Sequence, residues 1–539
     1  MKRYQVILCL IIIQLQCFAE NQNDKKILHL QTDKVLYVSG ENIGFKCTYT
    51  HPEKHNNVLF VDLCGEGYLI SSEILKSSNN HWNGEITVPD SVQTGVYLLR
   101  AYTGNPDGSP TLEAKFISVV NRFNNNEVNQ NRIKRKGYLP YNPLNCLPVA
   151  NGQGINVHAP ESSYSINEVI PFSIENELTG TEGGLSFSVF KIGETNGQPV
   201  NYTLPEKLYT SNPKIKIAKN FTIRGRVTKN QFPAINEMVY LSIPDSIPHI
   251  FYDYTNNAGE FQFEIDDYYG PQNMIVQTQN KAESLKIELY PYFLEAPKVI
   301  PYYLSQEAEK GEFSKLAVKR ATMHIAYSKR IKVKSRNTLF RYPVYGDKAM
   351  RVYPHDYIDL NDFDDIALNI LPIVKYRNTH DSAYVKLWDI DKRIYYDCPL
   401  LLVDGIPVSN TRNLNVLDSK KIKWVDMQAQ KRCFGDLIMD GILAIQTNKG
   451  GFSDIEMPKN SIALTVETFY NAPEQSEPIP FLRDVLAWNS KLEGDQKVNT
   501  VEVECSYEKG KYMAVAQTFD AEGNCHRSVF IFEVTDKRY

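Results

Sequence analysis

Few residues of this 539-residue chain have the types and spacing that covalent chemistry needs. The run Cys64-Gly65-Glu66-Gly67 carries the cysteine of an internal thioester, a bond that joins a Cys thiol to a Gln side chain three residues on. Gly67 has no acyl group to give, so we interpret the run as a strand end followed by a turn. The motifs typical of serine hydrolases, zinc proteases and phosphate-binding loops do not occur. The sequence therefore predicts no catalytic residue and no enzyme activity.

Two groups of side chains have spacings that suggest a metal ion. His51 and His55 are separated like two ligands on one helical turn, but Pro52 between them indicates a loop with surface histidines. The aspartates within 362–365 lack the glycine and the closing bidentate glutamate of a calcium loop. We interpret them as the favourable negative charges of a first helical turn. The sequence predicts neither a metal nor a cofactor.

Composition favours strands and turns over long helices. The chain has 33 Tyr and 24 Phe against 9 Met, with 28 Pro and 29 Gly distributed throughout. A formal net charge of −4 without a clustered basic face argues against nucleic acid as a partner. By length, such a chain forms about three to five domains. The expected fold is mostly β and multidomain, with successive β-sandwich domains and one small α+β domain.

The first 19 residues have the pattern of an export signal. Lys2 and Arg3 form the basic end, Val6 to Ile13 the apolar core, and 17–19 a small-residue cleavage site. Cleavage before Cys17 would instead give a lipoprotein, and that alternative stays open. No later segment approaches the apolar length of a membrane span, so the mature chain is expected to lack one. The expected location is the periplasm, the outer membrane or the cell surface.

Residues 27–121 alternate apolar and polar side chains between turn clusters, which predicts a β-sandwich. Two segments resemble the second macroglobulin domain of the α2-macroglobulin superfamily: TDKVLYVSGENIGFK and GEITVPDSVQTGVYLLRAYTG. A polar linker is expected over 122–154. Residues 155–218, with SYSINEVIPFSIENE and GGLSFSVFKI, resemble a further macroglobulin-type domain.

Residues 219–298 are expected to form another β-sandwich. The segments FTIRGRVTKNQFPAINEMVYLSI and TNNAGEFQFEI resemble the carboxypeptidase regulatory-like domain, a name that implies no peptidase activity. A helical connector is expected over 299–342, because apolar residues recur at helical spacing from Gln306 to Ile331.

Residues 343–458 contain the patterns PLLLVDGIPV and FGDLIMDGILAIQTNKG, which resemble the plug domain of TonB-dependent outer-membrane receptors. The apolar run 400–403 before Asp404-Gly405 predicts a strand and a tight turn. A helix capped by Asp359 or Asn361 and ending near Pro372 is expected upstream of them. Alternation places Ile422 in the core with Trp424 facing the same way.

Residues 459–539 are expected to form a C-terminal β-sandwich. The order of units resembles an exported Bacteroidota family that has no transport barrel. This resemblance implies a non-enzymatic binding or scaffolding protein of the outer-membrane envelope, an accessory of TonB-dependent transport machinery with a TonB-dependent receptor among its candidate partners. The alternative is a macroglobulin-like surface protein that contacts proteases or host proteins.

The plug resemblance also locates an expected interaction surface. Without a barrel around it, the polar surface of the plug-like unit must face solvent or another protein. A local excess of basic residues occurs there, and aromatic and Arg side chains are favoured at interface centres. The expected contact residues are Arg412, Lys431, Arg432 and Phe434. The alternative interpretation is that the charges only solubilise the domain.

Overall fold

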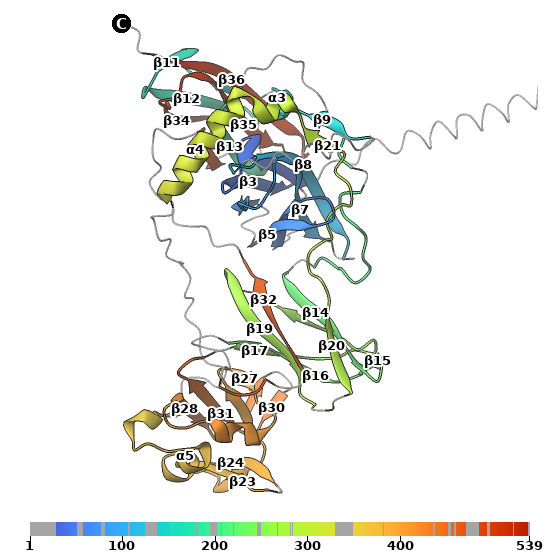
Figure 1. The fold of residues 1–539 in the computed structure, drawn as a ribbon, viewed down its shortest axis with the longest axis vertical. Helices are drawn as coiled ribbons and strands as arrows, with labels where there is room; N and C mark the ends of the chain where they lie inside the picture. Colours follow the sequence, from blue (N-terminus) through green and yellow to red (C-terminus); the bar gives the residue numbers. More distant parts are fainter. Residues whose placement is uncertain are drawn as a thin grey trace, which may run out of the picture. The chain divides into compact units, whose positions relative to one another are not determined.

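A computed structural model describes residues 28–536 apart from 51–57, 77–80, 106–107, 124–136, 152–153, 179–181, 194–201, 206, 219, 245–248, 267, 281, 283, 329–348, 381, 435–436, 451–453, 458–459, 470–483, 493–495 and 521. The expected signal peptide with Cys17, and the histidines 51 and 55, lie outside the described residues. The chain divides into unit 1 (Met1–Lys219, Phe293–Ser335 and Ala472–Tyr539) and unit 2 (Asn220–Tyr292 and Arg336–Asn471). Among the helices within the described ranges, none is long and apolar enough to cross a bilayer. The chain is mostly β and multidomain, as expected (Figure 1).

Sandwich A, within residues 28–121 of unit 1, packs a three-stranded sheet against a five-stranded one. Alternating side chains such as Phe45 and Trp82 are fully enclosed between the sheets, which is the burial that the period-two pattern predicts. The first sheet has the order β1 (Leu28–Thr32), β3 (Asn42–Tyr49), β6 (His81–Thr87); the second has the order β2 (Leu36–Val38), β8 (Pro110–Val120), β7 (Gly95–Gly104), β4 (Val58–Cys64), β5 (Leu69–Lys76).

Sandwich B, the second sandwich of unit 1, is built from two stretches of sequence that lie far apart along the chain. One sheet has the order β10 (Ile155–His158), β12 (Val169–Asn176), β34 (Val498–Glu504). The other has the order β11 (Ser163–Ser165), β36 (Cys525–Thr535), β35 (Gly510–Phe519), β13 (Glu182–Lys191), β33 (Val485–Leu492). The expected division into separate sandwiches at 155–218 and 459–539 is therefore wrong, because their strands pair within the same two sheets.

The physical reason for this shared sandwich is the burial of β13. Leu185, Phe187 and Val189 in β13 have no exposed surface, and both edges of the strand are hydrogen-bonded, to β35 on one side and to β33 on the other. The other described strands of 155–191 lie elsewhere in the sandwich, since β10 and β12 belong to the opposite sheet and β11 pairs with β36. An exposed edge of this kind is unfavourable, so the C-terminal strands complete the sandwich.

The connecting segments of unit 1 are ordered where the structure describes them. Within the expected linker 122–154, β9 (Leu139–Tyr141) pairs in parallel with β21 (Tyr302–Leu304), and a short helix η1 (Pro143–Cys146) follows. Tyr141 is buried in an apolar cluster on the outer face of sandwich A. The linker expectation is therefore wrong for residues 139–146, because Tyr141 packs against Phe116 and Tyr302.

The expected helix over 306–331 is present as two helices. α3 (Gln306–Lys310) is capped by the Ser305 hydroxyl and ends at Gly311, and α4 (Glu312–Ser328) follows directly. Ala317, Ala321 and Ile325 of α4 join the same buried cluster as strands β2 and β8. Residues 329–331 lie outside the described ranges.

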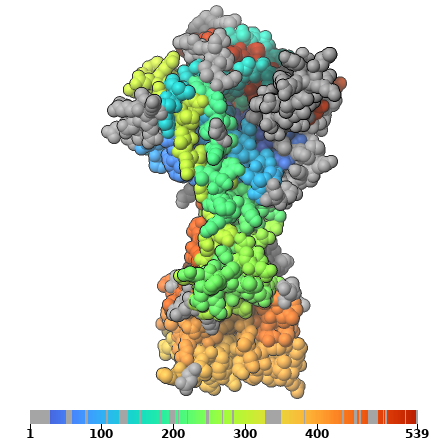
Figure 2. All heavy atoms as spheres, turned by 90° about the vertical axis from the view of Figure 1, so that its right-hand side faces the viewer, coloured from blue at the N-terminus to red at the C-terminus, as the bar shows by residue number. Residues whose placement is uncertain are grey.

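Sandwich C, the first part of unit 2, also takes a strand from far along the chain. One sheet comprises β14 (Thr222–Lys229), β15 (Phe232–Pro233), β18 (Glu260–Glu264) and β20 (Leu285–Leu289); the other has the order β17 (His249–Tyr254), β16 (Met238–Ile243), β19 (Pro271–Thr278), β32 (Ser461–Glu467). The expected sandwich at 219–298 is thus completed by β32, which was expected in the C-terminal domain. Figure 2 shows residues of sandwich C, in green, directly against the orange residues that follow them in unit 2.

The αβ subdomain, residues 350–447 of unit 2, contains two sheets, a hairpin and a short helix. The five-stranded sheet has the order β22 (Met350–Val352), β28 (Ile422–Gln428), β31 (Ile442–Thr447), β26 (Leu400–Val403), β27 (Ile406–Pro407); the three-stranded sheet has the order β23 (Val374–Asn378), β24 (Ala383–Asp389), β25 (Ile394–Tyr396). The remaining elements are α5 (Phe363–Asn369), η2 (Pro354–Asp356), η3 (Thr411–Val416) and the hairpin β29 (Arg432–Phe434), β30 (Leu437–Met439).

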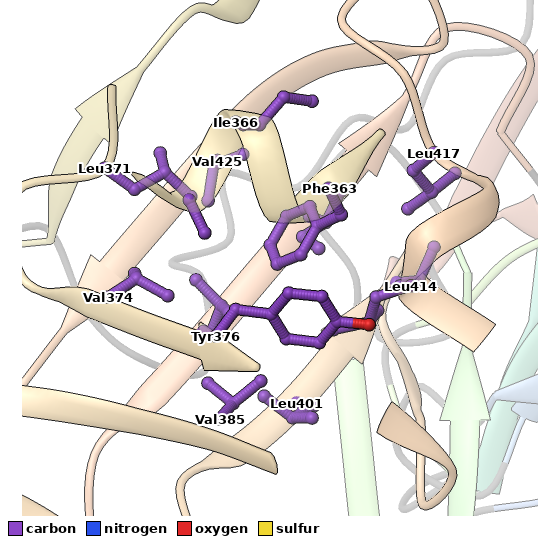
Figure 3. Close-up of a cluster of buried hydrophobic side chains, with 14 of the residues drawn as sticks. Phe363, Ile366, Leu371, Val374, Tyr376, Val385, Leu401, Leu414, Leu417 and Val425 are labelled. Carbon is purple, nitrogen blue, oxygen red and sulfur yellow. The ribbon is translucent and has the colours of Figure 1, made fainter. Parts of the chain in front are cut away.

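The core of this subdomain lies between α5 and the two sheets. In Figure 3 the rings of Phe363 and Tyr376 lie side by side, and their centroids are 5.2 Å apart in an edge-to-face arrangement. The Tyr376 hydroxyl donates a hydrogen bond to the Thr411 carbonyl oxygen at 3.1 Å, so this polar group has a partner at the edge of the core. The side chain of Asp362 caps α5 through the Asp365 amide, so the cap is Asp362 rather than Asp359 or Asn361.

The predicted turn after 400–403 is confirmed. Asp404 and Gly405 both have positive φ, 50° and 81°, as a two-residue hairpin between β26 and β27 requires. The prediction for Trp424 is wrong in detail, because a register shift falls between Ile422 and Trp424. Ile422 is fully buried, whereas Trp424 is half-buried and lies under the cationic groups of Lys423 and Arg351.

Candidate interaction surface

The four residues expected to form the interaction surface all belong to the αβ subdomain. Arg412 is in η3 and donates from Nη2 to the His380 carbonyl oxygen at 2.9 Å. Lys431 precedes β29 and forms an ion pair of 2.7 Å with Asp440. Arg432 and Phe434 begin and end β29. The side chain of Phe434 lies outside the part that the structure describes.

The structure does not bring Arg412 and Lys431 together. Arg412 contacts the turn that precedes β24, at His380. Lys431 lies 5.6 Å from the centre of the Tyr396 ring, and the neighbouring Gln430 reaches Asp391 in the turn that follows β24. A strand of seven residues spans about 20 Å, so the two cations flank opposite ends of β24.

A different surface of the same subdomain gathers cations and aromatic rings. The three-stranded sheet has one face on the core, where Val374, Val385 and Leu387 are buried. Side chains on the opposite face alternate with these; of them, Trp388 is half-buried and also packs against the core. We call this second set the basic–aromatic face; its members are Lys375, Arg377, Tyr384, Lys386, Trp388 and Tyr395.

Strand register sets the arrangement of the basic–aromatic face. Directly opposed pairs are Lys375 with Lys386, Arg377 with Tyr384, and Trp388 with Tyr395. Opposed side chains on one sheet face lie close enough to interact. The face therefore carries three cations and three rings over three adjacent strands.

Ring contacts hold these side chains in place. Trp388 and Tyr395 have their ring centroids 4.8 Å apart. The Lys375 ammonium lies 5.5 Å from the centre of the Tyr395 ring, and the Lys386 ammonium lies 5.4 Å from that of Tyr384. Cation–π contacts of this kind orient long side chains that would otherwise be mobile.

Charge on the basic–aromatic face is only partly balanced. Lys386 forms an ion pair of 2.7 Å with Asp397, and this hydrogen bond raises the pKa of the lysine. Among the described residues, Asp397 is the one acidic side chain within salt-bridge distance of the three cations. Three positive charges against one negative charge leave a positive excess that favours an acidic partner.

Sequence reasoning missed the basic–aromatic face, although the signal was present. The segments VKYRN and AYVKLWD alternate buried residues with basic or aromatic ones. Lys, Arg, Tyr and Trp at every second position indicate a strand whose outward face carries both basic and aromatic side chains. Their register across the sheet could not be obtained from either segment by itself.

A second group of unusual side chains lies in unit 1, around Asp33 and Lys34. Burial raises the pKa of Asp33 to about 7, while its carboxylate accepts hydrogen bonds from the Tyr37 hydroxyl at 2.5 Å and the Gly44 amide at 3.1 Å. The Lys34 ammonium bridges Glu41 of sandwich A, at 2.9 Å, and Asp484 beside sandwich B, at 2.6 Å. Perturbed pKa values often mark active sites. Here Asp33 and Lys34 are bonded to other groups of the protein, and the Lys34 ion pairs connect sandwich A to the start of β33 in sandwich B.

No protein-family model matches the sequence, and no curated protein matches it. The chain is similar to a solved mutant alpha-2-macroglobulin from Salmonella, with 10% identity and a TM-score of 0.22, over 95% of this chain and 40% of that one.

Two further solved structures are similar to a comparable degree. For Escherichia coli alpha-2-macroglobulin activated by porcine elastase, identity is 9% and the TM-score 0.23, over 94% of this chain and 44% of that one. For red sea bream transglutaminase, identity is 8% and the TM-score 0.15, over 52% of this chain and 33% of that one. The chain spans less than half the length of these proteins, and at such TM-scores the likenesses carry no argument about activity or partners.

Proposed function

We propose that this chain is a non-enzymatic, exported binding or scaffolding protein of the outer-membrane envelope. Its αβ subdomain contacts a protein partner through the basic–aromatic face. The observation that carries this proposal is the set of three cations and three aromatic rings on one face of the three-stranded sheet. An accessory role beside a TonB-dependent receptor is consistent with the plug-like pattern of residues 399–450.

Physical chemistry favours a protein partner with an acidic surface. Trp, Tyr and Arg are enriched among the few residues that dominate the binding energy at protein interfaces. Lys375 and Trp388 are already oriented by Tyr395, so little side-chain freedom remains to be lost on binding. The positive excess also steers an acidic partner toward the face.

A pull-down from cross-linked cells tests this proposal with two charge-matched variants. The face variant reverses Lys375, Arg377 and Lys386 to Glu. The matched variant reverses Arg412, Lys431 and Arg432 to Glu, so both change the charge by the same amount in the same subdomain. Thermal unfolding of each variant shows first that it folds.

We expect the face variant to lose its envelope partners and the matched variant to retain them. A photo-activatable residue in place of Tyr384 should cross-link to the same partner protein. If the face variant keeps every partner while the matched variant loses them, the contact lies at Arg412, Lys431 and Arg432 instead. If neither variant changes the set of partners, the αβ subdomain does not carry the interaction.

A further inference from the structure

A cavity of about 320 Å³ lies within unit 2, where sandwich C meets the αβ subdomain. Strands β16, β17 and β18 contribute one wall, and β26 and β30 contribute the other. Its walls are mostly aromatic and apolar, including Tyr240, Phe251, Tyr252, Phe263, Leu437 and Met439. Cavities at the junction of two domains or subdomains are common sites for small ligands.

Among the residues that the structure describes, none forms a hydrogen bond with the Tyr240 hydroxyl. Tyr240 is only 4% exposed, and its burial raises its pKa to about 12. A tyrosine hydroxyl usually forms a hydrogen bond. The Tyr240 oxygen is not among the described polar atoms that are both fully enclosed and unpartnered, so solvent in the cavity reaches it. Since Tyr240 lines the cavity, a bound molecule can supply a hydrogen-bond partner.

Charge is confined to one side of the cavity. Gln262 and Glu264 of β18 line it from exposed positions, and Glu264 accepts a hydrogen bond from Asn220. No other ionisable carboxylate or cation lines the cavity. An anionic ligand would therefore meet the Glu264 carboxylate and no counter-charge, which is unfavourable.

We propose that this cavity binds a small aromatic molecule that carries no negative charge and has one polar substituent. The ring packs against the aromatic walls and the Met439 sulfur, contacts that favour aromatic over aliphatic ligands. The substituent takes the hydrogen bond of the Tyr240 hydroxyl. The volume is ample for one substituted ring.

Ligand-observed NMR titration of the full mature protein tests the proposal, with p-cresol as the probe. Toluene lacks the hydroxyl, 4-methylcyclohexanol lacks the aromatic ring, and a blocked peptide with a central tyrosine carries the same phenol on a backbone. Tyr240→Phe removes only the hydroxyl. Leu437→Trp and Met439→Trp fill the cavity from two positions, and Leu368→Trp at a 79% exposed position is the control.

We expect p-cresol to bind more tightly than 4-methylcyclohexanol and the peptide. Tyr240→Phe should weaken p-cresol binding about five-fold, the effect of one neutral hydrogen bond, and leave toluene binding unchanged. Either filling variant that folds should abolish binding, whereas Leu368→Trp should not. Equal binding of p-cresol to the filled variants, tighter binding of the peptide, or no binding of p-cresol at all would overturn the proposal.

Discussion

Arg100 and Asp62 form an ion pair inside unit 1 in which neither side chain is exposed. The guanidinium donates to one carboxylate oxygen of Asp62 from Nε at 3.0 Å and from Nη2 at 2.7 Å. Its other hydrogen bonds go to the carbonyl oxygens of Leu208, at 3.1 Å, of Glu295, at 2.8 Å, and of Leu294. These carbonyls belong to the segments of unit 1 before residue 220 and after residue 292, so one side chain fixes both segments to sandwich A.

Replacing Arg100 should therefore destabilise unit 1 severely. Arg100→Met removes the positive charge beside the buried Asp62 carboxylate and the guanidinium donor of three backbone carbonyls, and we expect a loss of about 3–5 kcal/mol in the free energy of unfolding. Urea denaturation followed by tryptophan fluorescence measures this. Lys509→Met, which breaks the exposed pair with Asp536, is the control and should have little effect.

The double variant Asp62→Leu with Arg100→Met tests the cause of that loss. Removing both charges leaves no buried ion without a partner, so the double variant should be more stable than Arg100→Met alone. If the double variant is less stable than the unmodified protein by the full sum of the two single effects, the two side chains do not act as a pair.

Asp33 predicts a specific pH dependence of stability. Its pKa in the folded protein is raised to about 7, above the unfolded value, so folding favours the protonated carboxyl. The stabilisation from Asp33 is complete below about pH 4 and is lost as the pH rises through 7. Asp33→Asn keeps an acceptor for Tyr37 and Gly44 and should remove this dependence, so the variant should gain relative stability at pH 8.

Free energies of unfolding at pH 5 and pH 8 measure the effect. The gain of Asp33→Asn at pH 8 relative to pH 5 should be at most about 3 kcal/mol, since each of the two pH units between 5 and the folded pKa of about 7 corresponds to about 1.4 kcal/mol. An identical pH dependence in both proteins would show that Asp33 titrates normally.

Asp404 should be needed for the stability of the αβ subdomain. Its buried carboxylate accepts hydrogen bonds from the Thr447 amide and hydroxyl, both at 2.7 Å, and from Gln446 at 2.8 Å. Asp404→Ala removes these acceptors and puts alanine at a positive φ, so we expect a loss of about 3 kcal/mol. Asp404→Asn tolerates the same φ and keeps one acceptor, so it should cost about 1 kcal/mol. Thermal unfolding followed by circular dichroism compares them.

Sandwich B should not fold without the end of the chain. Removing residues 485–539 deprives β13 of β33 and β35 and deprives β12 of β34. Limited proteolysis should then cleave within 155–191, whereas a chain that ends at residue 536 should resist. Protection of 155–191 in the shorter chain would mean that this segment forms an independent domain.

Much of the local structure was available from the sequence, because it depends on neighbouring residues. The alternation in 27–121 predicts a sandwich that the structure confirms, and Asp404-Gly405 predicts a turn whose positive φ angles few residues other than Gly, Asn and Asp adopt readily. The helix after Asp362 follows from acidic residues that suit its first turn. Each of these features is fixed within a few residues of chain.

The tertiary structure decided which distant segments share a sheet and which side chains share a surface. β13 meets β35 across more than 300 residues, and the benefit of that pairing depends on burying both partners rather than on either sequence alone. Likewise, Lys375 and Tyr395 become neighbours only through the register of three strands. Arg412 and Lys431 lie near each other in the sequence and were expected on one surface. They are separated because η3 and β29 meet opposite ends of β24. Local propensities specify the strands, whereas non-local burial and pairing specify the order in which they assemble.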